Sequence, residues 1–316
     1  MSTERPREHG MDPEAAEPFT HAGATDEAFA FLDRLGRRLD LDVSPTVPAL
    51  REALLAHLRR EQAALAANGI VHQLCARALE VTDGAAARGE NAPAARVAIG
   101  QSCAAERADL ESARSAVALT ARALLVERGG WVATVGRSGT VSRALLGARE
   151  AGRGPRAIVS EARPRLSGRS LAAELAGAGV PVWLVVDAAL PLLLAQVSMV
   201  WLGAEAVTDR GVIAPVGGYA AALAAREHSV PVYVLAARRK FLPAATPALR
   251  IDEMPAAEVW GAPPEGVRPR NVRAELVPLE LLRAVIVEDG ALGATETAVV
   301  ARDRPLPEEL AGAPAR

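Results

Sequence analysis

The chain has 316 residues, of which 50% are hydrophobic and 23% charged, and 36 basic against 38 acidic residues give a net charge of −2. This length suits two domains with a sizeable core. The nearly neutral balance excludes a general electrostatic attraction to nucleic acid or to an anionic membrane, so we expect no direct nucleic-acid binding. Arginine supplies 35 of the 36 basic residues, and Lys240 is the only lysine.

Cysteine and histidine spacing argues against a metal site. Neither Cys75 nor Cys103 lies in a CxxC or Cys/His spacing, which also excludes a disulfide-stapled scaffold. Residues 1–20 contain no apolar core of a signal peptide, and the longest apolar run, 180–194, is interrupted by Asp187 and two prolines. We therefore expect a cytoplasmic protein with no membrane span and no cofactor.

The N-terminal part of the chain reads as helical. Residues 1–25 are polar and predict a flexible tail. Residues 26–129 carry leucines at three- and four-residue steps, which is the period of amphipathic helices, and show no strand-like alternation. They predict a helical N-terminal domain.

After residue 130, short β-branched runs alternate with Ala- and Leu-rich segments of helical length. The predicted strands are Trp131–Val135, 157–160, 182–186, 199–202 and 232–235, and the predicted helices between them are 140–151, 169–178 and 219–227. Short, continuous apolar strands are typical of a parallel sheet that is buried on both faces. The pattern predicts an α/β fold in which a Rossmann-like open parallel sheet over residues 130–305 follows the helical domain.

The C-terminal third has a weaker pattern. Residues 244–270 are rich in Pro and Gly and predict an excursion from the sheet. We expect a short strand at 275–277, a helix from 278 to about 288, and a tail over residues 306–316.

Polar residues follow all five predicted strands, at the sheet edge where ligands bind in open α/β folds. In strand order they are Arg137, Ser138, Gly139 and Thr140, then Arg163, Asp187, Glu205 and Lys240. Hydroxyls, helix N-termini and basic side chains suit a phosphate, and carboxylates suit sugar hydroxyls. Taken singly, each residue is also explained as a helix cap or a surface charge. Their agreement at five strand ends predicts a site for a phosphorylated small molecule.

Six short motifs occur in an order that resembles one known superfamily. They are E-A-R-P-R at 161–165, V-V-D-A-A at 185–189, G-A-E-A-V at 203–207, G-G-Y at 217–219, K-F at 240–241 and V-P-L-E at 277–280. The chain resembles the family of translation initiation factor 2B alpha, beta and delta subunits, methylthioribose-1-phosphate isomerase and ribose-1,5-bisphosphate isomerase. The resemblance covers about residues 130–290 and implies a homodimer or related oligomer with a phosphosugar or nucleotide pocket.

In the isomerase branches, the resemblance implies a catalytic Cys after the first strand and a catalytic Asp in a G-A-D motif. The Cys position is Gly136 in this chain, and the Asp position is Glu205. The family's Asn-Lys pair falls at Ala214-Pro215, and its Thr falls at Gly218. The chain thus keeps the ligand-binding residue types and lacks the acid–base pair in its usual form.

Three functions remain open from the sequence. The first is a non-catalytic, initiation-factor-2B-like protein that binds a sugar phosphate or nucleotide and acts through dimerisation or through a protein partner. The alternative is an aldose–ketose phosphate isomerase with Glu205 as the acid/base residue, and the third is a structural subunit with a vestigial pocket. If Lys240 faces the pocket, its retention in an arginine-rich chain indicates a need for a compact ammonium group.

Overall fold

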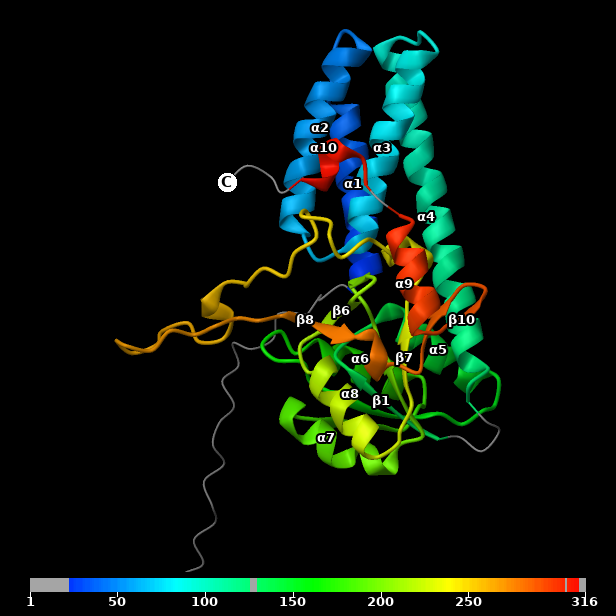
Figure 1. Ribbon diagram of the computed structural model, residues 1–316, viewed down its shortest axis with the longest axis vertical. Helices are drawn as coiled ribbons and strands as arrows, with labels where there is room; N and C mark the ends of the chain where they lie inside the picture. Colours follow the sequence, from blue (N-terminus) through cyan, green and yellow to red (C-terminus); the bar gives the residue numbers. More distant parts are fainter. Residues whose placement is uncertain (1–22, 126–129, 305, 313–316) are drawn as a thin grey trace, which may run out of the picture.

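The computed structural model describes residues 23–125, 130–304 and 306–312, and these form a helical region standing on an α/β region (Figure 1). The helical region consists of α1 (Ala24–Asp40), α2 (Val47–Ala64), α3 (Gly69–Ala87) and α4 (Ala92–Arg122). In the described ranges no helix is long and apolar enough to cross a membrane.

Local sequence signals account for where these helices begin. The side chains of Thr46, Asn68 and Asn91 accept backbone N–H groups in the first turns of α2, α3 and α4. The apolar faces of the four helices then share one core, which includes Phe31, Leu35, Leu50, Leu58, Ile70, Leu79, Ile99 and Leu110.

The main sheet has seven strands in the order β10-β9-β7-β4-β1-β2-β3. Its strands are β1 (Trp131–Val135), β2 (Arg156–Ser160), β3 (Val182–Val185), β4 (Met199–Leu202), β7 (Val232–Leu235), β9 (Ala284–Val287) and β10 (Gly290–Leu292). All neighbouring pairs are parallel except β9 with β10. The five runs predicted as strands are confirmed, and so is the α/β fold behind a helical N-terminal region.

Helices cover both faces of this sheet. On one face, α4, α5 (Gly139–Glu150) and α6 (Ser167–Gly177) pack on Trp201 and Leu235. The other face is covered by α7 (Leu190–Leu193), α8 (Gly218–Glu227) and α9 (Ala294–Arg302). Burial on both faces explains why the central strands are continuous apolar runs rather than alternating ones, whereas the edge strand β3 is partly exposed.

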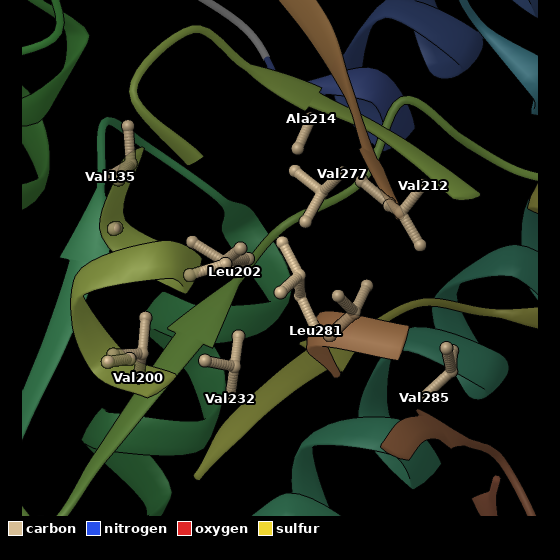
Figure 2. Packing of buried hydrophobic residues seen from close by; sticks show 14 of the residues in the cluster. Val135, Val200, Leu202, Val212, Ala214, Val232, Val277, Leu281 and Val285 are labelled. Atoms are coloured by element: carbon tan, nitrogen blue, oxygen red, sulfur yellow. The ribbon is translucent and has the colours of Figure 1, made fainter. Parts of the chain in front are cut away.

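A small antiparallel sheet completes the second core. It consists of β5 (Ala206–Val207), β6 (Gly211–Pro215) and β8 (Ala274–Pro278) in the order β5-β6-β8. Figure 2 shows Val277 and Ala214 from this sheet facing the same core as Leu202 and Val232 of the main sheet. The loop after β4 therefore runs directly into a second packed layer.

One sequence prediction near the C-terminus is wrong. The helix expected over 278–288 is only a short 3-10 turn, Leu279–Leu281, followed by β9. The run Ala284–Val287 is buried and contains three β-branched residues. Because it pairs with β7, it forms a strand of the main sheet.

The expected tails also prove shorter in the described part of the chain. Ala24 and Thr25 are buried in the first turn of α1, whereas residues 1–22 lie outside the described residues. Residues 306–312 include α10 (Glu308–Ala311), and Leu306 and Leu310 enter the core of the helical region. These two leucines fill apolar space that α2 and α3 leave open. Residues 126–129, 305 and 313–316 lie outside the described residues as well.

The helical and α/β regions meet tightly at the N-terminus of α3. The backbone N–H of Gly69 donates to the carbonyl oxygen of Glu205 at 3.0 Å. A Cβ at position 69 would lie 2.6 Å from the carbonyl oxygen of Lys240 and 3.1 Å from Cβ of Ala206. Only glycine allows α3 to approach the strand ends this closely.

We predict that Gly69→Ala lowers the free energy of unfolding by about 1–3 kcal/mol, because backbone must move to relieve the contact with Lys240. Gly100→Ala is the matched control, since position 100 lies inside α4 with nothing within 4 Å of a new Cβ. The control should gain about 0.5–1 kcal/mol from reduced backbone entropy. Urea denaturation of both variants checks this, and equal effects would contradict it.

Candidate functional site

The site lies where the strand order of the main sheet reverses, between β1 and β4. Connections leave β1 and β4 in opposite directions across the sheet, which opens a crevice at their carboxyl ends. The loops after the two strands pack together there, since a Cβ on Gly203 would lie 2.7 Å from Cβ of Ser138. The candidate residues predicted from the sequence lie on these loops.

A cavity that is partly open to solvent occupies this crevice. Its walls include Arg137, Ser138, Gly139, Thr140, Glu205 and Lys240, all of which were predicted from the sequence. The N-terminus of α1 adds Gly23, Ala24, Thr25 and Asp26 to the lining. The N-termini of two helices, α1 and α5, thus converge on one cavity, and both offer backbone N–H groups to an anion.

The contribution of α1 was not predicted from the sequence. Residues up to 25 read as a polar tail, and the run Gly23-Ala24-Thr25-Asp26 carries only a weak helix-start signal. Its place beside β1 and β4 depends on tertiary contacts, such as the 2.9 Å hydrogen bond from Asn68 Nδ2 to the Ala24 carbonyl oxygen. No local sequence pattern predicts such a contact.

Glu205 is the partly buried carboxyl group at the wall of this cavity. Among the described residues, its Oε2 has no hydrogen-bond partner. Burial raises the pKa of Glu205 to about 7, and the nearby Glu27 carboxylate adds to the effect, while Arg273 and Lys240 oppose it. A carboxyl group with such a pKa can both donate and accept a proton near neutral pH.

Lys240 lies at the end of a 3-10 turn, Arg238–Lys240, that follows β7. The residue is only 3% exposed, and it is one of the residues that line the cavity. The ammonium group donates to the Ala204 carbonyl oxygen at 2.5 Å. Burial lowers the pKa of Lys240, against the attraction of the Glu205 carboxylate. The single lysine of the chain is thus among the residues that line the cavity.

A second cavity adjoins the first and shares with it Gly23, Arg137, Glu205 and Pro215. Arg163, Arg165 and Arg273 line its outer part. Arg165 is paired with Glu258 at 2.8 Å and Arg273 with Glu27 at 3.5 Å, whereas the Arg163 guanidinium has no ion-pair partner among the described residues. Arg163 is therefore available to a ligand.

Arg273 was not expected from the sequence, because it follows the irregular excursion.

Asp187 has a different role from the one that the sequence suggested. It lines neither of the two cavities. Its Oδ1 accepts the backbone N–H of Ala162 at 2.8 Å, and its Oδ2 accepts that of Arg163 at 2.7 Å. The carboxylate thus positions the loop that carries Arg163.

Arg137 and Ser138 both have partners within the protein. Arg137 pairs with Asp26 at 3.4 Å and with Glu174 at 3.1 Å, so it ties the loop after β1 to α1 and α6. Ser138 caps α5 by accepting the backbone N–H of Val141 at 3.4 Å. An incoming anion would have to compete with the carboxylates on Arg137.

The backbone at Gly136 is incompatible with an ordinary side chain. Its φ is +61°, in the left-handed region. A Cβ there would lie 2.9 Å from Cβ of Ala162 and 3.0 Å from Oγ of Ser167. A side chain at position 136 would therefore force the neighbouring atoms to move. Within the described ranges there is also no group of three or more His, Cys, Asp or Glu residues that could hold a metal ion.

Curated relatives are isomerases. The chain is 38% identical over 186 residues to the methylthioribose-1-phosphate isomerase of Oleidesulfovibrio alaskensis, an alignment that covers 55% of this chain and 52% of the relative. It is 34% identical over 164 residues to the ribose 1,5-bisphosphate isomerase of Archaeoglobus fulgidus, which covers 50% and 52%. The chain thus spans about half the length of the curated relatives it matches.

Solved structures with a similar fold are initiation factor subunits. The Pyrococcus horikoshii translation initiation factor eIF-2B superposes with a TM-score of 0.68 at 24% identity, over 85% of this chain and 89% of that one. The tetrameric eIF2B-beta2-delta2 complex of C. thermophilum gives a TM-score of 0.68 at 21% identity, over 90% of both chains. At these identities the likeness shows the fold. Because the model of the initiation factor 2 subunit family matches residues 54–294, the chain belongs to that family.

Proposed function

We propose that this chain binds a sugar phosphate in the two joined cavities and that Glu205 is the acid/base residue of an aldose–ketose isomerisation. The observation that carries the proposal is the Glu205 carboxyl group itself. It lines both cavities, has a pKa of about 7, and has an Oε2 atom without a partner among the described residues. A structural carboxylate would normally be ion-paired or hydrogen-bonded instead.

The surroundings of Glu205 support a phosphorylated substrate. The N-termini of α1 and α5, together with Lys240, surround the first cavity, and Arg163 borders the second. These groups favour an anion by charge and by free backbone N–H groups. The curated relatives named above act on ribose derivatives with a phosphate on C1, in line with this charge distribution.

The chemistry needs one group that exchanges protons in both directions. In a furanose 1-phosphate, isomerisation moves hydride from C2 to C1 as the bond from C1 to the ring oxygen breaks. The ring oxygen gains a proton, and the C2 hydroxyl loses one. Glu205 in its protonated form would donate to the ring oxygen and then, as a carboxylate, accept the proton of the C2 hydroxyl. The nearby Lys240 ammonium would stabilise that carboxylate.

A specific observation favours a second candidate, binding without turnover. The family's catalytic cysteine position is Gly136, whose backbone excludes a side chain. In this reading, the pocket holds the same ligands, and Glu205 hydrogen-bonds a sugar hydroxyl. Action through dimerisation or through a protein partner would then be the function, as we considered from the sequence.

We also propose that the protein is a cytoplasmic homodimer. The family contains subunits that assemble, as in the tetrameric eIF2B-beta2-delta2 complex. The family match and the fold support an assembly of this kind.

The two candidate functions predict different results with methylthioribose-1-phosphate and ribose 1,5-bisphosphate. As an isomerase, the protein binds at least one of them in calorimetry and converts it to the ketose in a coupled assay. Glu205→Gln should keep the binding but lower turnover by about 10²–10⁴-fold. The exposed Glu280→Gln is the control, with unchanged turnover. Binding with no turnover supports the second candidate, and no binding of either ligand contradicts both.

Lys240→Arg tests the need for a compact ammonium group. Lys240 is almost fully buried, and its Nζ reaches the Ala204 carbonyl oxygen, so the larger guanidinium has to displace the loop after β4. We expect ligand affinity to fall at least tenfold despite the preserved charge. Arg163→Lys is the comparison at the open edge of the site, where a smaller loss is expected. Equal affinity of Lys240→Arg and the wild type would show that the lysine has no such role.

The raised pKa of Glu205 predicts a pH dependence of stability. The folded protein holds this proton up to about pH 7, whereas the unfolded chain releases it near 4.5. The free energy of unfolding should therefore fall as the pH rises between these values, by up to about 3 kcal/mol from this group. Glu205→Gln should be more stable than the wild type at pH 8 and similar at pH 4.5. Urea denaturation checks this, and a constant difference between the proteins would contradict it.

A cysteine at position 136, where the family resemblance implies the catalytic cysteine, should not raise turnover. Gly136→Cys places a Cβ against Ala162 and Ser167 at a positive φ, and we expect it to cost about 2–4 kcal/mol of stability without raising turnover. Gly152→Cys has a similar φ of +73° but nothing within 4 Å, so it isolates the cost of the backbone conformation. A gain in turnover with Gly136→Cys would show that the loop after β1 adapts.

A further inference from the structure

Glu27 lies in the first turn of α1, where the helical region meets the α/β region (Figure 1). Its side chain is 16% exposed, and it is not among the residues that line the two cavities of the candidate site. An acidic residue in a first turn stabilises a helix through the helix dipole, and that role needs no partner outside the helix. Glu27 nevertheless has specific partners on two other segments of the chain.

The side-chain amide of Asn68 binds one oxygen of Glu27. Asn68 is 1% exposed, and its Oδ1 accepts the backbone N–H groups of Ile70 and Val71 at 3.1 and 3.4 Å. These two bonds determine the orientation of the amide, so Nδ2 points away from α3. Nδ2 donates to the Ala24 carbonyl oxygen at 2.9 Å and to Oε2 of Glu27 at 3.1 Å. Oε2 is therefore a hydrogen-bond acceptor.

Arg273 binds the other oxygen of Glu27. Its Nη1 lies 3.5 Å from Oε1 of Glu27, and Arg273 also lines the second cavity together with Glu205. A proton on either oxygen of Glu27 would point at an N–H donor, and the hydrogen bond from that donor would be lost. The two partners therefore hold Glu27 as an anion.

Glu205 has the opposite surroundings. Its Oε2 has no hydrogen-bond partner among the described residues. Two cations act on it, but Arg273 pairs with Glu27. The other, Lys240, donates to the carbonyl oxygen of Ala204. A buried carboxyl group whose charge is not matched by a direct ionic partner is more stable with its proton.

The N-terminus of α3 connects the two carboxyl-bearing residues. Asn68 donates to the Glu27 side chain, and the next residue, Gly69, donates from its backbone N–H to the Glu205 carbonyl oxygen at 3.0 Å. The negative charge of Glu27 acts on the Glu205 carboxyl group, and like charges disfavour each other's ionisation. A fixed anion at Glu27 therefore opposes the loss of the proton from Glu205.

The geometry points to Glu27 as a positioning residue of the site: Asn68 and Arg273 hold it as an anion, and its charge keeps the proton on Glu205. Two neighbouring carboxyl groups thus have separate roles, one charged and one able to exchange a proton. The consequence for turnover rests on the isomerase function proposed above, whereas the proton on Glu205 can be measured without turnover.

The charged groups that act on Glu205 come from three segments, and they are Glu27 on α1, Arg273 before β8 and Lys240 after β7. Asp26 and Arg137 line the same cavity as Glu205 but pair with each other. Burial and Glu27 raise the pKa of Glu205, and the two cations lower it. Among these charged groups only Glu27 favours the proton, so neutralising it should make Glu205 a stronger acid.

The test titrates Glu205 in the full chain by difference infrared spectroscopy, with Glu205→Gln identifying the band of its protonated carboxyl group. We expect the wild-type midpoint at a pH of about 7. Glu27→Gln should lower the midpoint by about one pH unit, because a like charge is removed. Glu27→Asp keeps the charge and should retain most of the wild-type shift.

Asp40→Asn is the matched control, because it removes the same charge from the same helix. Asp40 is exposed at the last position of α1, about 20 Å further along the helix axis than Glu27. Its midpoint should equal that of the wild type. Circular dichroism and thermal unfolding show that the compared variants are folded. An unchanged midpoint in folded Glu27→Gln, an equal shift in Asp40→Asn, or a wild-type Glu205 with its ordinary pKa would overturn the proposal.

Turnover gives a second readout where it is present. With a midpoint one unit lower, kcat of Glu27→Gln should fall about tenfold at pH 8 and about twofold at pH 6, with KM nearly unchanged. A purely structural role would lower kcat equally at both pH values. A shifted midpoint without turnover contradicts the isomerase function and supports the role of Glu27. Turnover with an unshifted midpoint contradicts the role of Glu27 and supports the isomerase function.

Discussion

The structure depends on the close contact between the N-terminus of α3 and the strand ends of the main sheet. There Gly69 donates to the Glu205 carbonyl oxygen and touches the backbone of Lys240. This contact closes the helical region over the loops after β4 and β7. As a result, the Glu205 carboxyl and the Lys240 ammonium both lose water, and the pKa of the first is raised while that of the second is lowered. The shifted pKa values of the site are thus a product of interdomain packing rather than of the loops alone.

The same packing sets the charge that a ligand can carry. Glu27 is near enough to raise the pKa of Glu205, and it is itself paired with Arg273. A phosphate entering beside Lys240 would favour the protonated form of Glu205 further, because negative charge nearby disfavours the carboxylate. Binding of an anion and protonation of Glu205 are therefore coupled, so a bound phosphate would favour the acid form of Glu205.

An element of the fold or a residue of the site could be predicted where the sequence around it carries the relevant pattern. The strand Met199–Leu202 and the residue Glu205 after it were predicted, because a short apolar run followed by a polar residue marks a strand end. Residues 23–26 and Arg273 were not, since they reach the cavity only through contacts with distant segments. The strand Ala284–Val287 was read as a helix, since its short apolar run gives no distinct period and its pairing with β7 decides the outcome.

The length of α4 limits how the site can open. Its first half, with Ile99 and Leu110, belongs to the core of the helical region, and its last turns, with Val117 and Ala121, pack on the main sheet. Its 31 residues make a continuous rod about 45 Å long. A hinge between the two regions would have to break this rod or slide it out of one core. Ligand exchange must instead use small movements at the rim, where the first turn of α1 and the loop with Arg163 border the cavities.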